Sequence, residues 1–227
     1  MVNETMMETA EKKTPVKAVL FDLDGTLLDT LPDLVTVTNA TLRDAGYPER
    51  SREEIIWMIG NGSVNLLKRA LPSPDLFTDA LFQEMLKNYH RYQNVDTKPF
   101  PGVGETLAAL KERGVRTAIV TNKPDEAAQE VSEKYFSGLI DYTVGIRTGE
   151  NVKPDPHTAF RAMRYFGVSP EQCLYVGDSD TDIETAKNAG VRCLSAAWGY
   201  RGEAFLLEHG AKTVIRRPED ILRFIPA

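Results

Sequence analysis

The sequence predicts an α/β fold, a doubly wound parallel sheet that carries a long insertion of helices. Short, continuous apolar runs recur along the chain with helix-like segments between them, a pattern typical of parallel strands covered on both faces. The exception is residues 31–98, where no run resembles a strand and the apolar spacing is helical. Together these observations place an all-helical unit between the first and second core strands.

Six runs are expected to form the strands of the core sheet. They are residues 16–21, 115–121, 139–145, 173–178, 191–197 and 212–215. Between the first two, Val103, Leu107 and Leu110 repeat at helical spacing, and Gly114 is expected to end that helix in a left-handed conformation. A further short helix is expected in "SDTDIETAKNAG", which starts with acidic residues and ends at Gly190.

The insertion is expected to consist of several amphipathic helices. Leu34, Val37, Leu42 and Ala45 fit one face of a first helix, and "REEIIWMIGNGSVNLLKRAL" and "DLFTDALFQEMLKNYHRY" are typical of further helices. The predicted organisation is therefore a core domain of residues 15–30 and 99–227 and a helical domain of residues 31–98. Residues 1–14 are polar and are expected to form a flexible tail.

Composition and charge indicate which classes of partner and which compartment suit the protein. The 227 residues carry a formal net charge of -6, which argues against a chain that grips nucleic acid or anionic lipid but allows a phosphorylated small molecule. No apolar run approaches the roughly 20 residues that span a bilayer, and residues 1–14 lack a secretory apolar stretch. Cys173 and Cys193 lie in apolar runs and suit buried thiols in a reducing compartment, so a cytoplasmic protein is expected.

Polar residues follow the predicted strands where those strands end. The first strand runs into Asp22 and Asp24, the second into Thr121 and Asn122, and a later one into Asp178, with Asp182 close behind and Lys153 between. Carboxyl ends of parallel strands meet at one edge of the sheet, where ligands bind. Crowded carboxylates need a cation, and ligands that are all oxygen suit Mg²⁺. Lys153 and Thr121 would add the donors that bind a tetrahedral oxyanion.

Four of these segments carry a resemblance to a known family. "FDLDGT", "VTN", "VKPDP" and "VGDSDTD" resemble, in order and with ordinary gaps, the four motifs of the haloacid dehalogenase superfamily. The resemblance extends over residues 16–227 and implies a Rossmann-like core with a helical C1 cap inserted after the first motif.

The same resemblance implies a role for each motif residue. Asp22 would be the nucleophile that forms an aspartyl-phosphate, and Asp24 the acid for the leaving oxygen and then the base for water. Thr121 and Lys153 would hold the phosphoryl oxygens. Mg²⁺ would be bound by Asp22, by the backbone carbonyl of Asp24 and by Asp178. Asp182 would either bind the ion as well or support one of its ligands. The implied activity is Mg²⁺-dependent hydrolysis of a small phosphorylated metabolite.

The helical insertion carries a finer resemblance that points to a substrate. "IGNGSVNLLKRAL" (59–71) resembles the specificity loop of phosphoglycolate phosphatases, so 2-phosphoglycolate is the first expectation. Asn61, Gly62 and Lys68, with Asn122 from the core, would bind the substrate, Lys68 by pairing with its carboxylate. Lys68 is equally typical of a solvated helix residue, and the glycines of a plain turn.

Alternatives remain open at this point. Another substrate (a sugar phosphate, a nucleotide or pyrophosphate) or a phosphomutase similar to β-phosphoglucomutase is compatible with the same motifs. A receiver-like signalling domain that accepts phosphate shares the acid cluster, but it is about half this length and lacks the insertion. A monomer or a homodimer is expected.

Overall fold

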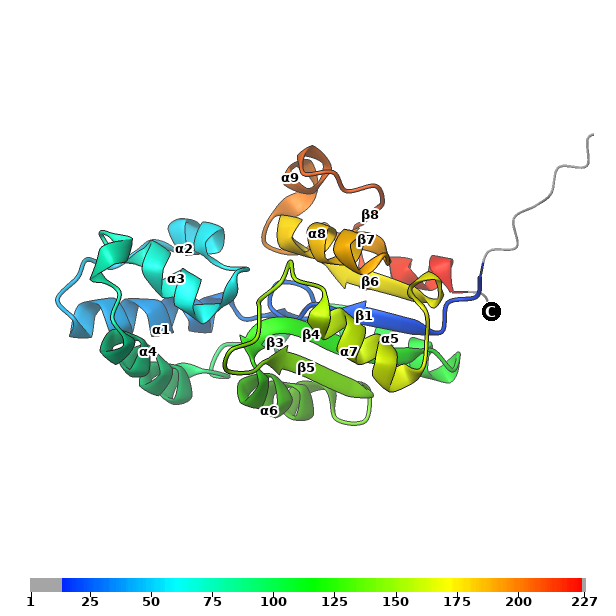
Figure 1. Cartoon of the computed structure of the whole chain (residues 1–227), viewed down its shortest axis with the longest axis horizontal. Helices are drawn as coiled ribbons and strands as arrows, with labels where there is room; N and C mark the ends of the chain where they lie inside the picture. The colour runs from blue at the N-terminus through cyan, green and yellow to red at the C-terminus, as the bar shows by residue number, and fades with distance from the viewer. Residues whose placement is uncertain (1–13, 226–227) are drawn as a thin grey trace, which may run out of the picture.

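The core of the protein is a six-stranded parallel sheet with the strand order β5-β4-β1-β6-β7-β8 (Figure 1). This computed structural model describes residues 14–225, so the tail expected at residues 1–14 lies, but for Thr14, outside the described residues. The strands are β1 (Ala18–Phe21), β4 (Arg116–Pro124), β5 (Tyr142–Ile146), β6 (Cys173–Gly177), β7 (Arg192–Ala196) and β8 (Val214–Ile215). The predicted doubly wound sheet is thereby confirmed.

Strand β1 lies at the centre of this sheet because it is apolar on both faces. Its four residues are buried, and Ala18 is in register with Arg116 of β4 on one side and with Cys173 of β6 on the other. A strand with both edges paired and both faces covered has no exposed surface except at its ends. Whatever follows Phe21 is therefore delivered to the middle of the carboxyl edge.

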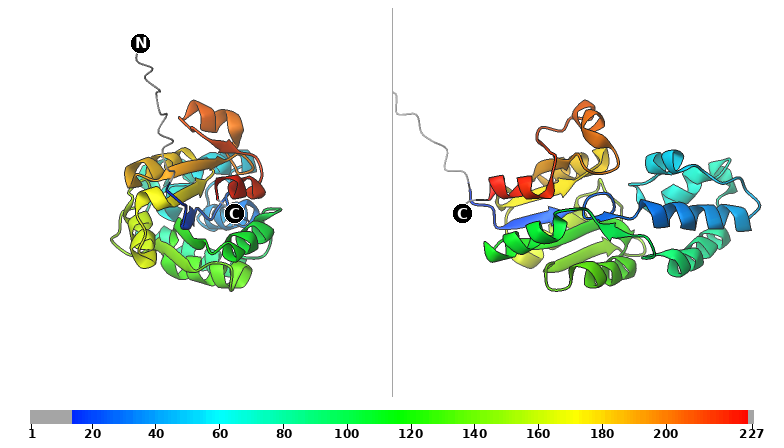
Figure 2. Two further views of the ribbon diagram at one scale, coloured as in Figure 1. Left: turned by 90° about the vertical axis from the view of Figure 1, so that its right-hand side faces the viewer. Right: turned by 180° about the vertical axis from the view of Figure 1, so that it is seen from behind.

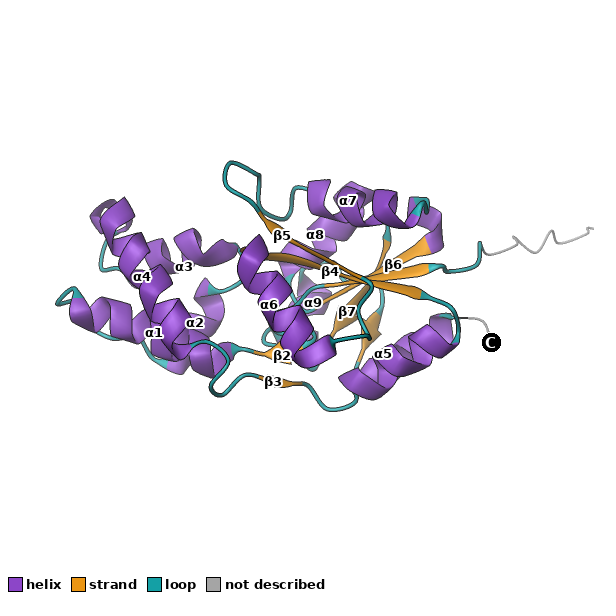
Figure 3. Ribbon diagram, turned by 90° about the horizontal axis from the view of Figure 1, so that it is seen from below, coloured by secondary structure: helices purple, strands orange, loops and turns teal. Residues whose placement is uncertain are grey.

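Helices cover both faces of the sheet (Figure 3). On one face, α7 (His157–Phe166) and α8 (Asp180–Ala189) bury small side chains such as Ala159 and Ala186. On the other, α5 (Val103–Glu112), α6 (Asp125–Phe136) and a 3-10 helix (Pro218–Phe224) bury larger ones. Helix α9 (Gly202–Glu208) and a 3-10 turn (Pro170–Gln172) complete the core. Gly114, with φ 70°, follows α5 as expected.

The insertion is helical, as the sequence predicts, and it extends beyond the carboxyl ends of the strands (Figures 1 and 2). It consists of α1 (Leu31–Asp44), α2 (Arg52–Met58), α3 (Gly62–Ala70), a 3-10 turn (Pro74–Leu76) and α4 (Asp79–Tyr92). These helices enclose a small apolar core of their own, which includes Leu42, Ile55 and Leu67. The domain boundaries at residues 30–31 and 98–99 stay a prediction.

Two short strands that the sequence analysis missed join the insertion to the core. Strand β2 (Leu28–Asp29) pairs antiparallel with β3 (Lys98–Pro99), so the chain leaves and re-enters the core side by side. Two-residue strands leave no periodic pattern to detect. Asp33 adds a second tie, since its carboxylate accepts hydrogen bonds from the backbone N–H groups of Val95, Asp96 and Thr97.

Within residues 14–225 there is no helix both long and apolar enough to cross a membrane.

Candidate active site

Asp22 and Asp24 lie at the carboxyl end of β1, at the centre of the sheet edge. The backbone N–H of Asp22 still bonds to the carbonyl of Val176 on β6, which fixes the start of the loop. Gly25 then turns the chain with φ 93°. A Cβ atom at Gly25 would lie 2.5 Å from Oδ2 of Asp178, so glycine alone lets the loop approach that carboxylate.

Three buried carboxylates meet beside this loop. Asp22, Asp178 and Asp182 each offer an oxygen, and the three oxygens lie within 4.8 Å of one another. Burial raises the pKa of Asp178 to about 7, with the Asp182 carboxylate adding to the effect, and burial together with Asp182 also raises the pKa of Asp22. Thr26 Oγ1 (3.0 Å) and the N–H of Tyr200 (2.8 Å) hold Asp178 in place. A cluster of oxygen donors destabilised by mutual repulsion fits a hard divalent cation.

Lys153 is buried among these acids. Its Nζ lies 2.8 Å from Oδ1 of Asp22 and 2.7 Å from Oδ1 of Asp182, and its side chain is 2% exposed. Burial lowers the pKa of Lys153, but the carboxylates of Asp182 and Asp22 outweigh it and hold that pKa well above its usual value. The second oxygen of Asp182 accepts from Ser179 Oγ at 2.6 Å. Asp182 therefore orients Lys153 toward Asp22.

Thr121 and Asn122 reach the same edge at the end of β4, as predicted. Asn122 Oδ1 accepts from the N–H of Lys153 at 2.6 Å, and its Nδ2 donates to the carbonyl of Gly60 at 2.8 Å. The Asn122 side chain thus joins the Lys153 loop to the insertion. Thr121 lines the cavity that opens beside Asp22.

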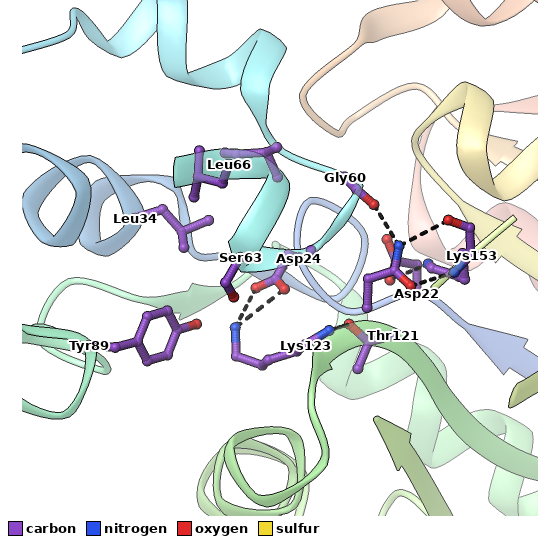
Figure 4. Close-up of a pocket in the computed structure, with 13 residues that line it drawn as sticks. Asp22, Asp24, Leu34, Gly60, Ser63, Leu66, Tyr89, Thr121, Lys123 and Lys153 are labelled. Carbon is purple, nitrogen blue, oxygen red and sulfur yellow. Dashed lines mark hydrogen bonds and ion pairs between the residues drawn. The ribbon is translucent and has the colours of Figure 1, made fainter. Parts of the chain in front are cut away.

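The cavity lies between the sheet edge and the insertion (Figure 4). Its core side is polar and is formed by Asp22, Asp24, Thr121, Asn122, Lys123 and Lys153. Its other side is mostly apolar and comes from the insertion, with Leu34, Ile59, Gly60, Gly62, Ser63, Leu66 and Tyr89. Such a cavity can hold an anionic group against the sheet while the helices cover the rest of a small ligand.

The predicted substrate residues of the insertion do not all reach this cavity. Gly62 lines it, and Asn61 bonds through Oδ1 to Thr181 Oγ1 of the core at 3.0 Å. Lys68 is not among the lining residues, because its Nζ lies over the Phe77 ring of the insertion, 4.9 Å from the centroid. Helix α3 thus presents its first turn to the cavity and carries Lys68 away from it, and the pairing of Lys68 with a substrate carboxylate stays a prediction.

One cation of the cavity was missed in the sequence analysis. Lys123 Nζ lies 2.9 Å from Oδ1 and 3.3 Å from Oδ2 of Asp24, and its side chain is 4% exposed. Figure 4 shows the hydroxyl of Tyr89 directed toward this ammonium group. The signal was available, since Lys123 directly follows "VTN" at the end of the same strand.

Comparison with known proteins agrees with this geometry. Residues 19–196 match the family model of the haloacid dehalogenase-like hydrolases. The chain belongs to this family. A phosphoglycolate phosphatase of Aquifex aeolicus is 34% identical over 211 residues, which cover 92% of this chain and 97% of the relative. Phosphoglycolate phosphatase 1 of Pseudomonas aeruginosa is 36% identical over 217 residues, covering 91% of this chain and 78% of that one.

A solved structure has the same architecture as this chain. The crystal structure of a candidate phosphoglycolate phosphatase from Lactobacillus delbrueckii subsp. bulgaricus superposes with a TM-score of 0.85 at 29% identity, covering 94% of this chain and 100% of that one. With these relatives and this site, the chain is an enzyme of the phosphatase class. Membership of this hydrolase family sets aside the receiver-like signalling alternative.

Proposed function

We propose that the protein hydrolyses a small acidic phosphate monoester, 2-phosphoglycolate in the first place, through an aspartyl-phosphate on Asp22. One observation carries this proposal: Asp22 lies at a cavity with Lys153 paired to its carboxylate at 2.8 Å and Asp24 two residues on. The names of the relatives from Aquifex aeolicus and Pseudomonas aeruginosa support the choice of substrate.

In the first half-reaction, Asp22 attacks the phosphorus and the P–O bond to the alcohol breaks. Lys153 favours the ionised form of the Asp22 carboxylate against the effects of burial and Asp182, and it donates to a phosphoryl oxygen, while Thr121 Oγ1 donates to another. Preorganised donors of this kind stabilise the charge that builds up on the phosphoryl oxygens in the transition state. Asp24 gives its proton to the leaving alkoxide.

In the second half-reaction, Asp24 takes a proton from water, which attacks the phosphoryl group on Asp22. Phosphate leaves and the Asp22 carboxylate is regenerated. Positioned acid–base groups of this kind contribute about 10²–10⁴-fold in rate. Between the two proton transfers, Lys123 pairs with the Asp24 carboxylate and holds it at the cavity wall.

The acid cluster fits a bound Mg²⁺ ion. Asp22 and Asp178 would hold it through carboxylate oxygens, and Asp24 through its backbone carbonyl. Asp182 lies within the cluster, but its oxygens already accept from Lys153, Tyr175 and Ser179, so it acts through Lys153. A bound Mg²⁺ ion neutralises carboxylate and phosphoryl charge.

The deciding experiment is a panel of phosphate esters assayed for phosphate release with and without Mg²⁺. We expect 2-phosphoglycolate to give the highest kcat/KM, EDTA to abolish release, and Asp22→Asn to be inactive. Highest activity on a sugar phosphate, a nucleotide or pyrophosphate would replace the substrate, and isomerisation of a sugar phosphate would indicate a phosphomutase. Full activity after thorough chelation would contradict the proposed requirement for Mg²⁺.

A further inference from the structure

We propose that Lys123, assisted by the hydroxyl of Tyr89, binds the second anionic group of the substrate, the carboxylate that lies beyond the ester oxygen. This inference rests on the proposed function, because it concerns the acidic end of the same ligand. It assigns specificity to a core lysine at the end of β4, in place of the Lys68 expected from the sequence.

The cavity offers few cations that could bind a second anionic group. Among the described residues that line it, two are cationic, Lys123 and Lys153. Lys153 is bonded to Asp22 and Asp182 at the phosphoryl end. The described residues of the insertion that line the cavity carry no charge. A buried carboxylate requires a cationic or strongly hydrogen-bonding partner, so Lys123 is the group that can accept one at the other end.

The bonding capacity of Lys123 carries the second step. An ammonium group has three N–H donors, and in the described part of the chain those of Lys123 meet the single carboxylate of Asp24, at 2.9 and 3.3 Å, and the neighbouring hydroxyl of Tyr89. The 3.3 Å contact to Oδ2 of Asp24 is the longer of the two, so a ligand carboxylate can take that donor while the 2.9 Å bond to Oδ1 is kept. Burial raises the pKa of Tyr89, so its hydroxyl keeps its proton and can donate beside the ammonium. The Tyr89 ring centroid lies 5.2 Å from Lys123 Nζ.

Lys123 lies where the second anionic group of the substrate is expected. In Figure 4 the site runs from Lys153 and Asp22, through Asp24 and Lys123, to Tyr89. The phosphorus must lie against Asp22, and the ester oxygen toward its acid, Asp24. The ammonium that bonds to Asp24 therefore lies beside the atoms that follow the ester oxygen. A carboxylate one carbon beyond that oxygen suits this place, which favours short phosphorylated hydroxy acids.

The test compares 2-phosphoglycolate with 2-hydroxyethyl phosphate, which replaces the carboxylate by a neutral hydroxymethyl group. The readout is the ratio of kcat/KM for the two esters. Any effect of Lys123 on Asp24 is common to both substrates and cancels in the ratio. We expect Lys123→Met to lower the ratio about 10- to 100-fold, mostly through KM, since a hydrogen bond to a charged group is lost. Tyr89→Phe should lower it about 2- to 10-fold.

Two comparisons complete the test. Lys123→Gln keeps a polar, hydrogen-bonding side chain but removes the positive charge, so it serves if Lys123→Met does not fold, and a fall in the same direction is expected. Lys87→Met, an exposed lysine on the same helix as Tyr89, should leave the ratio unchanged.

The inference is overturned if the Lys123 variants keep the wild-type ratio, or if Lys68→Met lowers the ratio instead. A wild-type ratio near one would also overturn it while leaving the phosphatase activity intact. Failure of the wild-type enzyme to hydrolyse either ester would instead contradict the proposed function.

Discussion

Lys153 Nζ lies 2.7 Å from Oδ1 of Asp182, and Ser179 Oγ holds the other oxygen of that carboxylate at 2.6 Å. Asp182 is 0% exposed. A buried carboxylate bonded on both oxygens is fixed in direction, so the ammonium it binds is fixed as well. The "VGDSDTD" motif therefore supplies two acids with different duties, Asp178 facing the loop of Asp22 and Asp182 facing the lysine.

This division of duties predicts different effects of removing each acid. We expect Asp178→Asn to raise the Mg²⁺ concentration for half-maximal activity by about 10- to 100-fold. Asp182→Asn should lower kcat by a similar factor at saturating Mg²⁺, because Lys153 loses its orienting partner. Activity measured against Mg²⁺ concentration separates the two. Asp180→Asn, exposed at the start of α8, is the matched control, and an equal Mg²⁺ shift in that variant would contradict the assignment.

The spacing of Asp22 and Asp24 predicts a trapped intermediate. Asp24→Asn keeps the nucleophile but removes the base for water, so an aryl phosphate with a good leaving group should load the enzyme and stall. Intact-protein mass spectrometry after acid quench should show a gain of one phosphoryl group that hydroxylamine removes. Asp22→Asn should show no gain. A phosphoryl group found on a serine, threonine or histidine would rule out Asp22 as the nucleophile.

Arg201 ties the core to the insertion. Its guanidinium donates to the carbonyls of Ile56 (2.6 Å) and Ile59 (3.0 Å) at the end of α2 and lies 4.8 Å from the Trp57 ring. We expect Arg201→Gln to speed amide hydrogen exchange in α2 by about 10- to 100-fold, since bonds from a charged donor are lost. Strands β1 and β4 should be unaffected. Arg216→Gln, which breaks the exposed pair with Glu203, is the control, and equal exchange in both variants would refute the tie.

The two thiols should be inert in the native protein. Cys173 is buried and Cys193 half-buried, and removal from water raises the pKa of each thiol to about 12, so both keep their protons at pH 8. Unfolded thiols ionise near pH 8.5, so the unfolded state binds fewer protons above that pH and the free energy of unfolding falls as pH rises. Labelling with a thiol reagent at pH 8 should be slow in the native protein and should reach both cysteines in denaturant. A native cysteine labelled as fast as a free thiol would contradict this burial.

The sequence by itself determined the parallel sheet, the helical insertion and most of the acidic site. Runs such as residues 16–21 are apolar at every position, and burial on both faces follows from that composition alone. Parallel strands bring their carboxyl ends together at one edge of the sheet. The residues that follow the strands therefore lie near one another, and this does not depend on the details of packing. The positions of Asp22 and Asp178, which directly follow β1 and β6, agree with this rule.

Only the tertiary structure decided how the insertion meets the core. Lys123 and Asp24 are 99 residues apart, and their ion pair depends on the path of the β1 loop across the end of β4. The direction of Lys68, the bond from Asn122 to Gly60 and the β2–β3 pair depend on where the helices rest. A local pattern records which side of a helix is apolar, but it holds no information on which polar residue of that helix faces a cavity. That choice is made by the angle at which one packed unit lies on another.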